Sequence, residues 1–242
     1  MKFYQLALRN LKEIYRDPIS LLLGLAMPIV LLVLFTSIQG DMEIEMFTPQ
    51  AMTPGIIVFC YAFLIMFSSL LLARDRQNSL LTRLFTTPLK PSDYILAYVL
   101  PFIPIAFFQT LICLVTGIIL GGTFAHIGAV LLVFTLLAVI CISLGITFGA
   151  LFTVNQTSGI GSIFITTIGL FSGVWMNLKV VGGVFETIGY ALPFAHAVDA
   201  SREVLAGASL ADVTANLYWV AAYAVGTFLL AIWAFRWSMR RV

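Results

Sequence analysis

Lysine is rare in this chain of 242 residues, and no lysine stands in a phosphate-binding motif. A P-loop has the pattern G-x-x-x-x-G-K-[ST], in which backbone amides surround the phosphates and Ser or Thr follows the lysine. The lysines of this chain are Lys2, Lys12, Lys90 and Lys179. In that order they are followed by Phe, Glu, Pro and Val, so none is followed by Ser or Thr. We therefore expect that this chain is not an ATPase and that it binds no cofactor itself.

The other residue types that could do chemistry are equally sparse. His126 and His196 are too few for a metal site, and the three cysteines lie inside apolar runs without metal-ligand spacing. No apolar run carries an ionisable residue near its middle, where an ion-coupled transporter usually has one. Gln109 is the only amide side chain well inside such a run. We interpret it as a helix-packing contact, with a substrate contact on a transport pathway as the alternative.

The composition excludes a soluble globular protein. Hydrophobic residues make up 61% of the chain and charged residues 10%, with a mean hydropathy of +1.04. A soluble domain carries roughly 25% charged residues, so most of this surface must face membrane lipid. The net charge of +2 is too small to indicate a nucleic acid partner.

The elements that position these residues are apolar stretches, each long enough to cross a bilayer as a helix of about 20 residues. We predict an all-α integral membrane protein with one permease domain, 1–242, and six transmembrane helices. These spans are expected at about 18–38, 54–73, 92–120, 127–152, 159–176 and 217–237. Asp17–Pro18 and Thr53–Pro54 each combine an N-cap with a first-turn proline, which marks a helix start. The amphipathic stretch 2–16 predicts an N-terminal interfacial helix, and the Gly- and Pro-interrupted segment 180–206 predicts an outer re-entrant helical hairpin.

Charge fixes the expected orientation. When connections alternate between the two sides of the membrane, only Lys179 and Arg202 of the 13 Lys and Arg residues fall on one side. Because Lys and Arg are retained on the cytoplasmic side, both termini are predicted to be cytoplasmic in a multi-pass protein of the cell membrane. An odd number of spans would scatter the basic residues over both sides.

The segment 74–87 follows the second expected span and predicts a short amphipathic helix on the cytoplasmic side. Its apolar residues fall on one face, and its polar residues, among them Arg76, Thr82 and Arg83, fall on the other. Pro88 and Pro91 would end the helix and redirect the chain. Such a face suits docking of a soluble partner, and a passive solvated loop is the alternative.

Two segments resemble the permeases of type-2 ATP-binding-cassette (ABC) exporters. After the second span these permeases have a pattern close to Arg-Glu-Arg-Glu-x-Gly-Thr-Leu-Glu-x-Leu, followed by Thr-Pro-Leu. This chain matches it at Asp75, Arg76, Leu81, Arg83, Leu84, Thr87, Pro88 and Leu89, and departs from it at Gln77, Ser79 and Leu80. The run 172–207 resembles the stretch before the last span, with Pro193, Asp199 and Arg202 in its Pro-x-x-x-x-x-Asp-x-x-Arg pattern.

The resemblance implies a permease subunit that exports a hydrophobic or amphipathic substrate, such as a drug, an antibiotic or a lipid. Two copies, or one copy and a paralogue, would form the pathway. A separate cytoplasmic ABC ATPase would bind ATP and magnesium and would dock on the coupling helix, 74–87. The expected docking residues are Arg74, Asp75, Arg76, Asn78, Ser79, Thr82, Arg83, Pro88 and Lys90. The expected hinge residues are Pro28, Pro101 and Pro104, and the expected outer gate residues are Pro193, Asp199 and Arg202.

Other functions remain open on the sequence. A permease for lipid-linked glycans belongs to the same class, although the resemblance is closer to drug and antibiotic exporters. An ion-coupled secondary transporter is disfavoured by the lack of intramembrane charge. A membrane scaffold without transport activity would leave the 74–87 segment as an ordinary connection.

Overall fold

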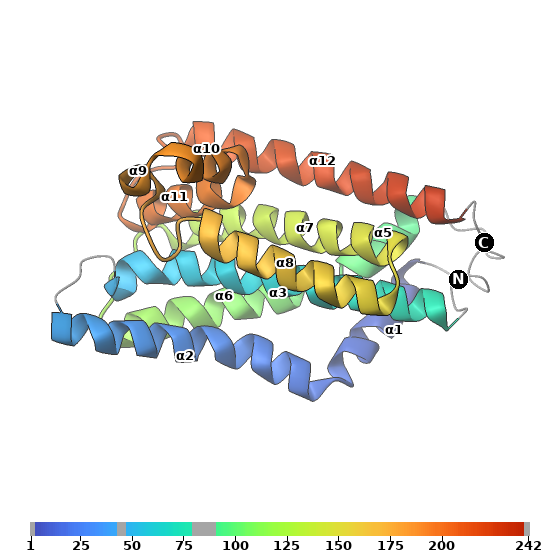
Figure 1. Ribbon diagram of the computed structural model, residues 1–242. Coiled ribbons are helices and arrows are strands. Elements are labelled where there is room, and N and C mark those ends of the chain that lie inside the picture. The colour runs from blue at the N-terminus through green and yellow to red at the C-terminus, as the bar shows by residue number, and fades with distance from the viewer. Residues whose placement is uncertain (1–2, 43–46, 79–90, 240–242) are drawn as a thin grey trace.

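The computed structural model describes residues 3–42, 47–78 and 91–239. Every regular element among them is a helix, which confirms the predicted all-α class, and the long helices run alongside one another in one bundle (Figure 1). The helices are α1 (Phe3–Tyr15), α2 (Pro18–Met42), α3 (Pro49–Gln77), α5 (Pro91–Val99), α6 (Phe102–Ile119), α7 (Ile127–Leu151), α8 (Val154–Phe171), α9 (Leu178–Val181), α10 (Gly183–Ala191), α11 (Pro193–Leu205) and α12 (Thr214–Met239).

Four stretches of helix in the described part of the chain are long and apolar enough to cross a membrane. They are Pro49–Gln77, Ser92–Ile119, Ile127–Leu151 and Thr214–Ser238. The expected spans 18–38 and 159–176 correspond to α2 and α8, which lie along the same bundle but are not among these four. In α2 the described apolar stretch is the shorter Gly24–Ile38. The protein therefore has an apolar membrane body, and the count of six spans stays a prediction.

Capping residues explain where two helices begin earlier than the sequence predicted. Thr48 precedes Pro49 in extended conformation and its hydroxyl accepts a hydrogen bond from the Ala51 amide, so α3 begins there and Thr53–Pro54 lies inside it. Thr153 and Gln156 form a capping box at the start of α8. Residues 154–158, which precede the start expected at 159, therefore form the first turn of α8.

Proline has different effects in two of the expected spans. α2 continues through Pro28, whereas the expected span 92–120 is interrupted: α5 ends at Val99 and α6 begins at Phe102. Pro101 occupies the N-cap of α6, and Pro104 lies in its first turn. A proline ring clashes with the preceding turn and lacks an amide hydrogen, so a break at Pro101 is the expected result.

The centre of the bundle is α3, which packs against α2, α6, α7, α8 and α11. Its contact with α7 is closest where Gly145 and Gly149 lie against Ser68 and Ser69. The Ser68 hydroxyl donates to the Leu64 carbonyl at 2.6 Å and lies 3.3 Å from the Ile142 carbonyl of α7. Small residues of this kind let two helices approach closely in lipid, where no hydrophobic effect drives them together.

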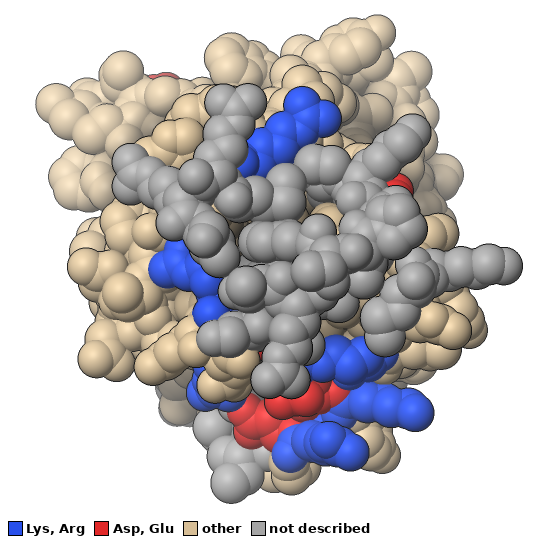
Figure 2. All heavy atoms as spheres, turned by 90° about the vertical axis from the view of Figure 1, so that its right-hand side faces the viewer, with Lys and Arg blue, Asp and Glu red and all other residues tan. Residues whose placement is uncertain are grey.

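The two ends of the bundle differ. The short helices α9, α10 and α11 gather at one end, and α1 and the end of α12 lie at the other (Figure 1). Figure 2 faces the second end, where Lys and Arg side chains gather beside Asp and Glu side chains at one edge. The segment expected as a hairpin of two helices, 180–206, contains the end of α9 and then α10 and α11.

We predict that Gly145→Ala separates α3 from α7. A Cβ atom at this position would lie 2.4 Å from the Ile65 carbonyl oxygen, a backbone atom that cannot rotate away. Overpacking of this kind costs about 1–3 kcal/mol, so the unfolding temperature in detergent should fall.

The matched control is Gly128→Ala in the same helix, where a Cβ atom would meet nothing within 4 Å. This control should leave the unfolding temperature unchanged or raise it. Equal unfolding temperatures for the two variants would contradict the assigned contact.

Candidate functional site

The last turn of α3 carries three consecutive charged residues, Arg74, Asp75 and Arg76, at the end of the bundle where α1 lies. The Asp75 side chain is only 4% exposed and forms an ion pair with Arg9 of α1. The hydroxyl of Tyr98 in α5 also donates to Asp75 Oδ2, at 2.7 Å. Asp75 therefore joins three helices through one buried carboxylate.

The amphipathic helix α1 is fixed by this carboxylate and by a second contact. The Asn10 amide, fully buried, donates to the Ala97 carbonyl of α5 at 3.1 Å. Burial lowers the pKa of the Arg9 guanidinium, but the hydrogen bond and charge of Asp75 outweigh it, so the pKa is raised above its ordinary value. Arg9 thus stays charged, and α1 is held against α3 and α5 at the bundle's end.

Arg76 makes its hydrogen bonds to a different helix, α7. Its guanidinium donates to the carbonyls of Ala150 and Phe152 at the end of α7, the second at 2.7 Å. These are among the terminal carbonyls that have no partner within their own helix, and a cation near them also suits the helix dipole. Arg76 is therefore a C-terminal cap for α7 supplied by α3.

The structure divides the expected docking residues into three groups. Arg74 and Asn78 are exposed at the end of α3, whereas Asp75 and Arg76 contact other helices of the same chain. Residues 74–77 continue α3 and do not start a separate helix. The remaining docking residues lie outside the described residues: Ser79, Thr82, Arg83, Pro88 and Lys90. Their docking role stays a prediction.

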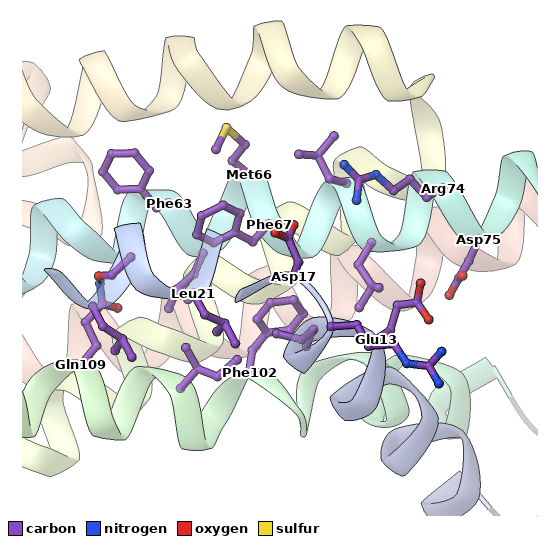
Figure 3. Close-up of a pocket in the computed structure, with 18 of the residues that line it drawn as sticks. Glu13, Asp17, Leu21, Phe63, Met66, Phe67, Arg74, Asp75, Phe102 and Gln109 are labelled. Carbon is purple, nitrogen blue, oxygen red and sulfur yellow. Dashed lines mark hydrogen bonds between the residues drawn. The ribbon is translucent and has the colours of Figure 1, made fainter. Parts of the chain in front are cut away.

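Beside this turn of α3 a pocket of about 420 Å³ opens between α1, α2, α3 and α6 (Figure 3). Glu13, Arg74 and Asp75 lie toward one end of the pocket, and Gln109 lies at the other. Between them the walls are mainly apolar and aromatic. The aromatic residues are Phe63, Phe67 and Phe102. The pocket therefore has a charged mouth and an apolar interior.

Gln109 closes the inner end of this pocket. Its side chain makes a helix-packing contact, which is one of the two interpretations considered from the sequence. Its side-chain amide Nε2 donates to the Gly24 carbonyl of α2 at 2.9 Å. Because a carbonyl can only accept, this contact fixes which amide atom faces α2. The other atom, Oε1, is buried and has no hydrogen-bond partner within the described residues.

The expected outer gate residues are brought together at the opposite end. Pro193 occupies the first turn of α11, and Asp199 of the same helix accepts a hydrogen bond from the Tyr190 hydroxyl of α10. The Arg202 guanidinium reaches the Ala51 carbonyl near the start of α3, at 3.0 Å. Burial lowers the pKa of Arg202, and burial together with the Asp199 hydrogen bond raises the pKa of Tyr190. α11 is thereby fastened to the other end of α3.

His196 stabilises the same group of helices. Its Nε2 lies 3.0 Å from the Tyr190 carbonyl oxygen, and its Nδ1 lies 2.8 Å from Asn216 Oδ1. The ring also stacks on Trp219 of α12. These contacts agree with a packed histidine.

The sequence did not indicate the partners of Asp75. Arg9 and Tyr98 are separated from it in the chain, and each occurs in an ordinary amphipathic or apolar pattern. A carboxylate at the end of an apolar run, with arginine on the amphipathic helix that precedes it, is the one signal that could have suggested the pair.

Comparison with known proteins decides the family. A family model described as ABC-2 type transporter matches residues 1–206, which run from α1 to the end of α11. This chain belongs to the ABC-2 type transporter family. None of the curated proteins searched matches it. The match makes the chain an ABC-2 type permease. Asp75 with its partners Arg9 and Tyr98, and the pocket beside them, therefore belong to a transport subunit.

We predict that Arg9→Leu destabilises the permease, because it leaves Asp75 buried without its cation. Breaking a buried pair costs about 3–5 kcal/mol. Here we expect about 2 kcal/mol, since the Arg9 side chain is 35% exposed. Thermal unfolding in detergent measures the change.

Two further variants test the cause. Combining Arg9→Leu with Asp75→Leu should recover part of the lost stability, because no buried charge then remains. Lys12→Leu, at an exposed position of the same helix, should have little effect. A double variant less stable than the sum of its single changes would contradict the pairing.

Proposed function

We propose that this chain is the membrane-spanning permease subunit of an ABC exporter, driven by a separate cytoplasmic ATPase. The family match over residues 1–206 carries the proposal. The sequence contains no P-loop, so the energy of ATP must come from a partner chain. Export of a hydrophobic or amphipathic molecule is favoured by the earlier resemblance and by a pocket with a charged mouth and an apolar interior.

The expected coupling helix, 74–87, is proposed to receive the movement of the ATPase. Its first residues lie in the last turn of α3, and this turn contacts α1, α5 and α7 through Asp75 and Arg76. A displacement at Asn78 would therefore reach three other helices at once. Among the described residues, the docking candidates are the exposed side chains of Arg74 and Asn78. Arg83, outside the described residues, is a candidate from the sequence alone.

A second permease copy, or a paralogue, is proposed to complete the pathway. α8 exposes a stripe of small and polar residues along one side: Asn155, Gly159, Ser162 and Thr166. Small residues permit close helix contact between subunits in a membrane. The Ser162 hydroxyl donates to the Ser158 carbonyl at 3.1 Å, and the Thr166 hydroxyl donates to the Ser162 carbonyl at 3.0 Å.

Reconstitution tests the proposed function. The permease is isolated from its own membranes with its bound proteins and placed in liposomes, with Hoechst 33342 and a fluorescent phospholipid as probes. We expect movement of a probe that requires Mg-ATP, and no ATP hydrolysis once the bound proteins are removed. Movement driven by an ion gradient alone, or hydrolysis by the isolated chain, would contradict the proposal.

Charge reversal separates docking from folding in the same assay. Arg83→Glu should leave the unfolding temperature unchanged and lower co-purification of the ATPase, since removing one partner of a desolvated pair costs about 2–5 kcal/mol. Arg76→Glu should instead lower the unfolding temperature, because it places a carboxylate against the carbonyls that end α7. Unchanged co-purification and transport with Arg83→Glu would remove the docking role.

The proposed orientation places both termini and Asn78 in the cytoplasm and the 41–53 connection outside. Single cysteines, Asn78→Cys and Glu43→Cys, are introduced after the three native cysteines are replaced. An impermeant maleimide should label position 43 in intact cells, and label position 78 only after lysis. The reverse pattern would overturn the topology.

A further inference from the structure

The pocket beside the last turn of α3 has features that the exporter proposal does not explain. Of its charged residues, Glu13 and Asp75 both pair with Arg9, and Asp17 has an interaction of its own. Arg16 and Arg74 also line the pocket, and neither forms an ion pair with another described residue. The mouth therefore carries two cations that have no ion-pair partner among the described residues.

The inner end of the pocket carries an unsatisfied hydrogen-bond acceptor. Gln109 is 3% exposed, and its Oε1 is the amide atom left without a partner once Nε2 has bonded to Gly24. A buried polar atom without a partner costs about 1–3 kcal/mol, so a donor that reached it would bind favourably.

The distance between these two features sets the shape of a ligand. Asp17 at the mouth and Gly24 at the inner end are seven residues apart on the chain leading into α2, or about 10 Å along a helix. The wall between them is formed by apolar and aromatic side chains, including Phe63, Phe67 and Phe102. A ligand that satisfies both ends has an anionic head, an apolar body about 10 Å long and a hydroxyl or amide donor at the far end of that body.

We propose that this pocket binds an anionic amphiphile whose apolar chain carries a hydrogen-bond donor, with the head at Arg16 and Arg74 and the donor at Gln109. A hydroxylated fatty acid is the simplest molecule of this class. The proposal rests on the proposed function only for placing the mouth at the cytoplasmic side of the membrane. Binding needs neither ATPase nor nucleotide, so its failure and the failure of ATP-driven export are separate results.

The test compares 10-hydroxydecanoate with decanoate, which differ only in the terminal hydroxyl. The full chain is purified in a neutral detergent, and ligand adducts are titrated by native mass spectrometry. The hydroxylated acid should bind about three- to tenfold more tightly, as expected for one net hydrogen bond. The methyl ester of 10-hydroxydecanoate should bind weakly, because it lacks the anionic head.

Variants assign the two ends of the pocket. Gln109→Leu should make the affinities for 10-hydroxydecanoate and decanoate equal, and the exposed Gln50→Leu should leave the difference intact. Arg74→Gln and Arg16→Gln should each weaken both acids by a similar factor, whereas Arg236→Gln, at the end of α12, should weaken neither. The unfolding temperature of each variant is measured to show that it is folded.

Three results would overturn the proposal. They are equal binding of the two acids by the unaltered chain, a hydroxyl preference that survives Gln109→Leu, and binding of the methyl ester as tight as that of the acid. The first two remove the donor site at Gln109, and the third removes the anion site at the mouth.

Discussion

The close contact between α3 and α7 is the constraint on which the rest of the bundle depends. In lipid, two helices gain little from burying apolar surface against each other, so they must interlock through small residues and local polar contacts. Gly145 and Gly149 provide that approach opposite Ser68 and Ser69, and leave no room for a Cβ atom. Since α2, α6, α8 and α11 also pack on α3, the spacing of this one pair sets the position of the whole body.

Both ends of α3 are tied to other elements by arginines that donate to backbone carbonyls. Arg76, within α3, reaches the end of α7, and Arg202, within α11, reaches the start of α3. A guanidinium can satisfy several carbonyls at once, which suits helix ends whose carbonyls lack partners. Asp75 adds α1 and α5 at one end. The central helix thus joins the end that carries the docking candidates to the end that carries α9, α10 and α11 (Figure 1).

The sequence predicted the features that depend on residue type and local spacing. Apolar length gave the helical membrane class, and the family followed from residue patterns that the comparison then confirmed. Proline at 101 indicated the interruption between α5 and α6. The start of α3 was misplaced because threonine is followed by proline both at 48–49 and at 53–54, and the sequence does not show that Thr48 forms the N-cap. The pairing of Asp75 with Arg9 was not foreseen, since it joins residues 66 apart that no periodicity connects.

The hydroxyls along α8 bear on how the protein is made. Ser162 and Thr166 face outward, yet each donates to a carbonyl of its own helix, so neither needs a partner from elsewhere. An unsatisfied donor in hydrocarbon would hold a nascent helix at the insertion machinery or the membrane surface. If α8 crosses the bilayer as predicted, hydroxyls that bond within the helix would let it enter as a single chain, and the same side could later meet the proposed second subunit. Insertion and assembly would then be separate in time, and a newly made copy could diffuse in the membrane before it meets its neighbour.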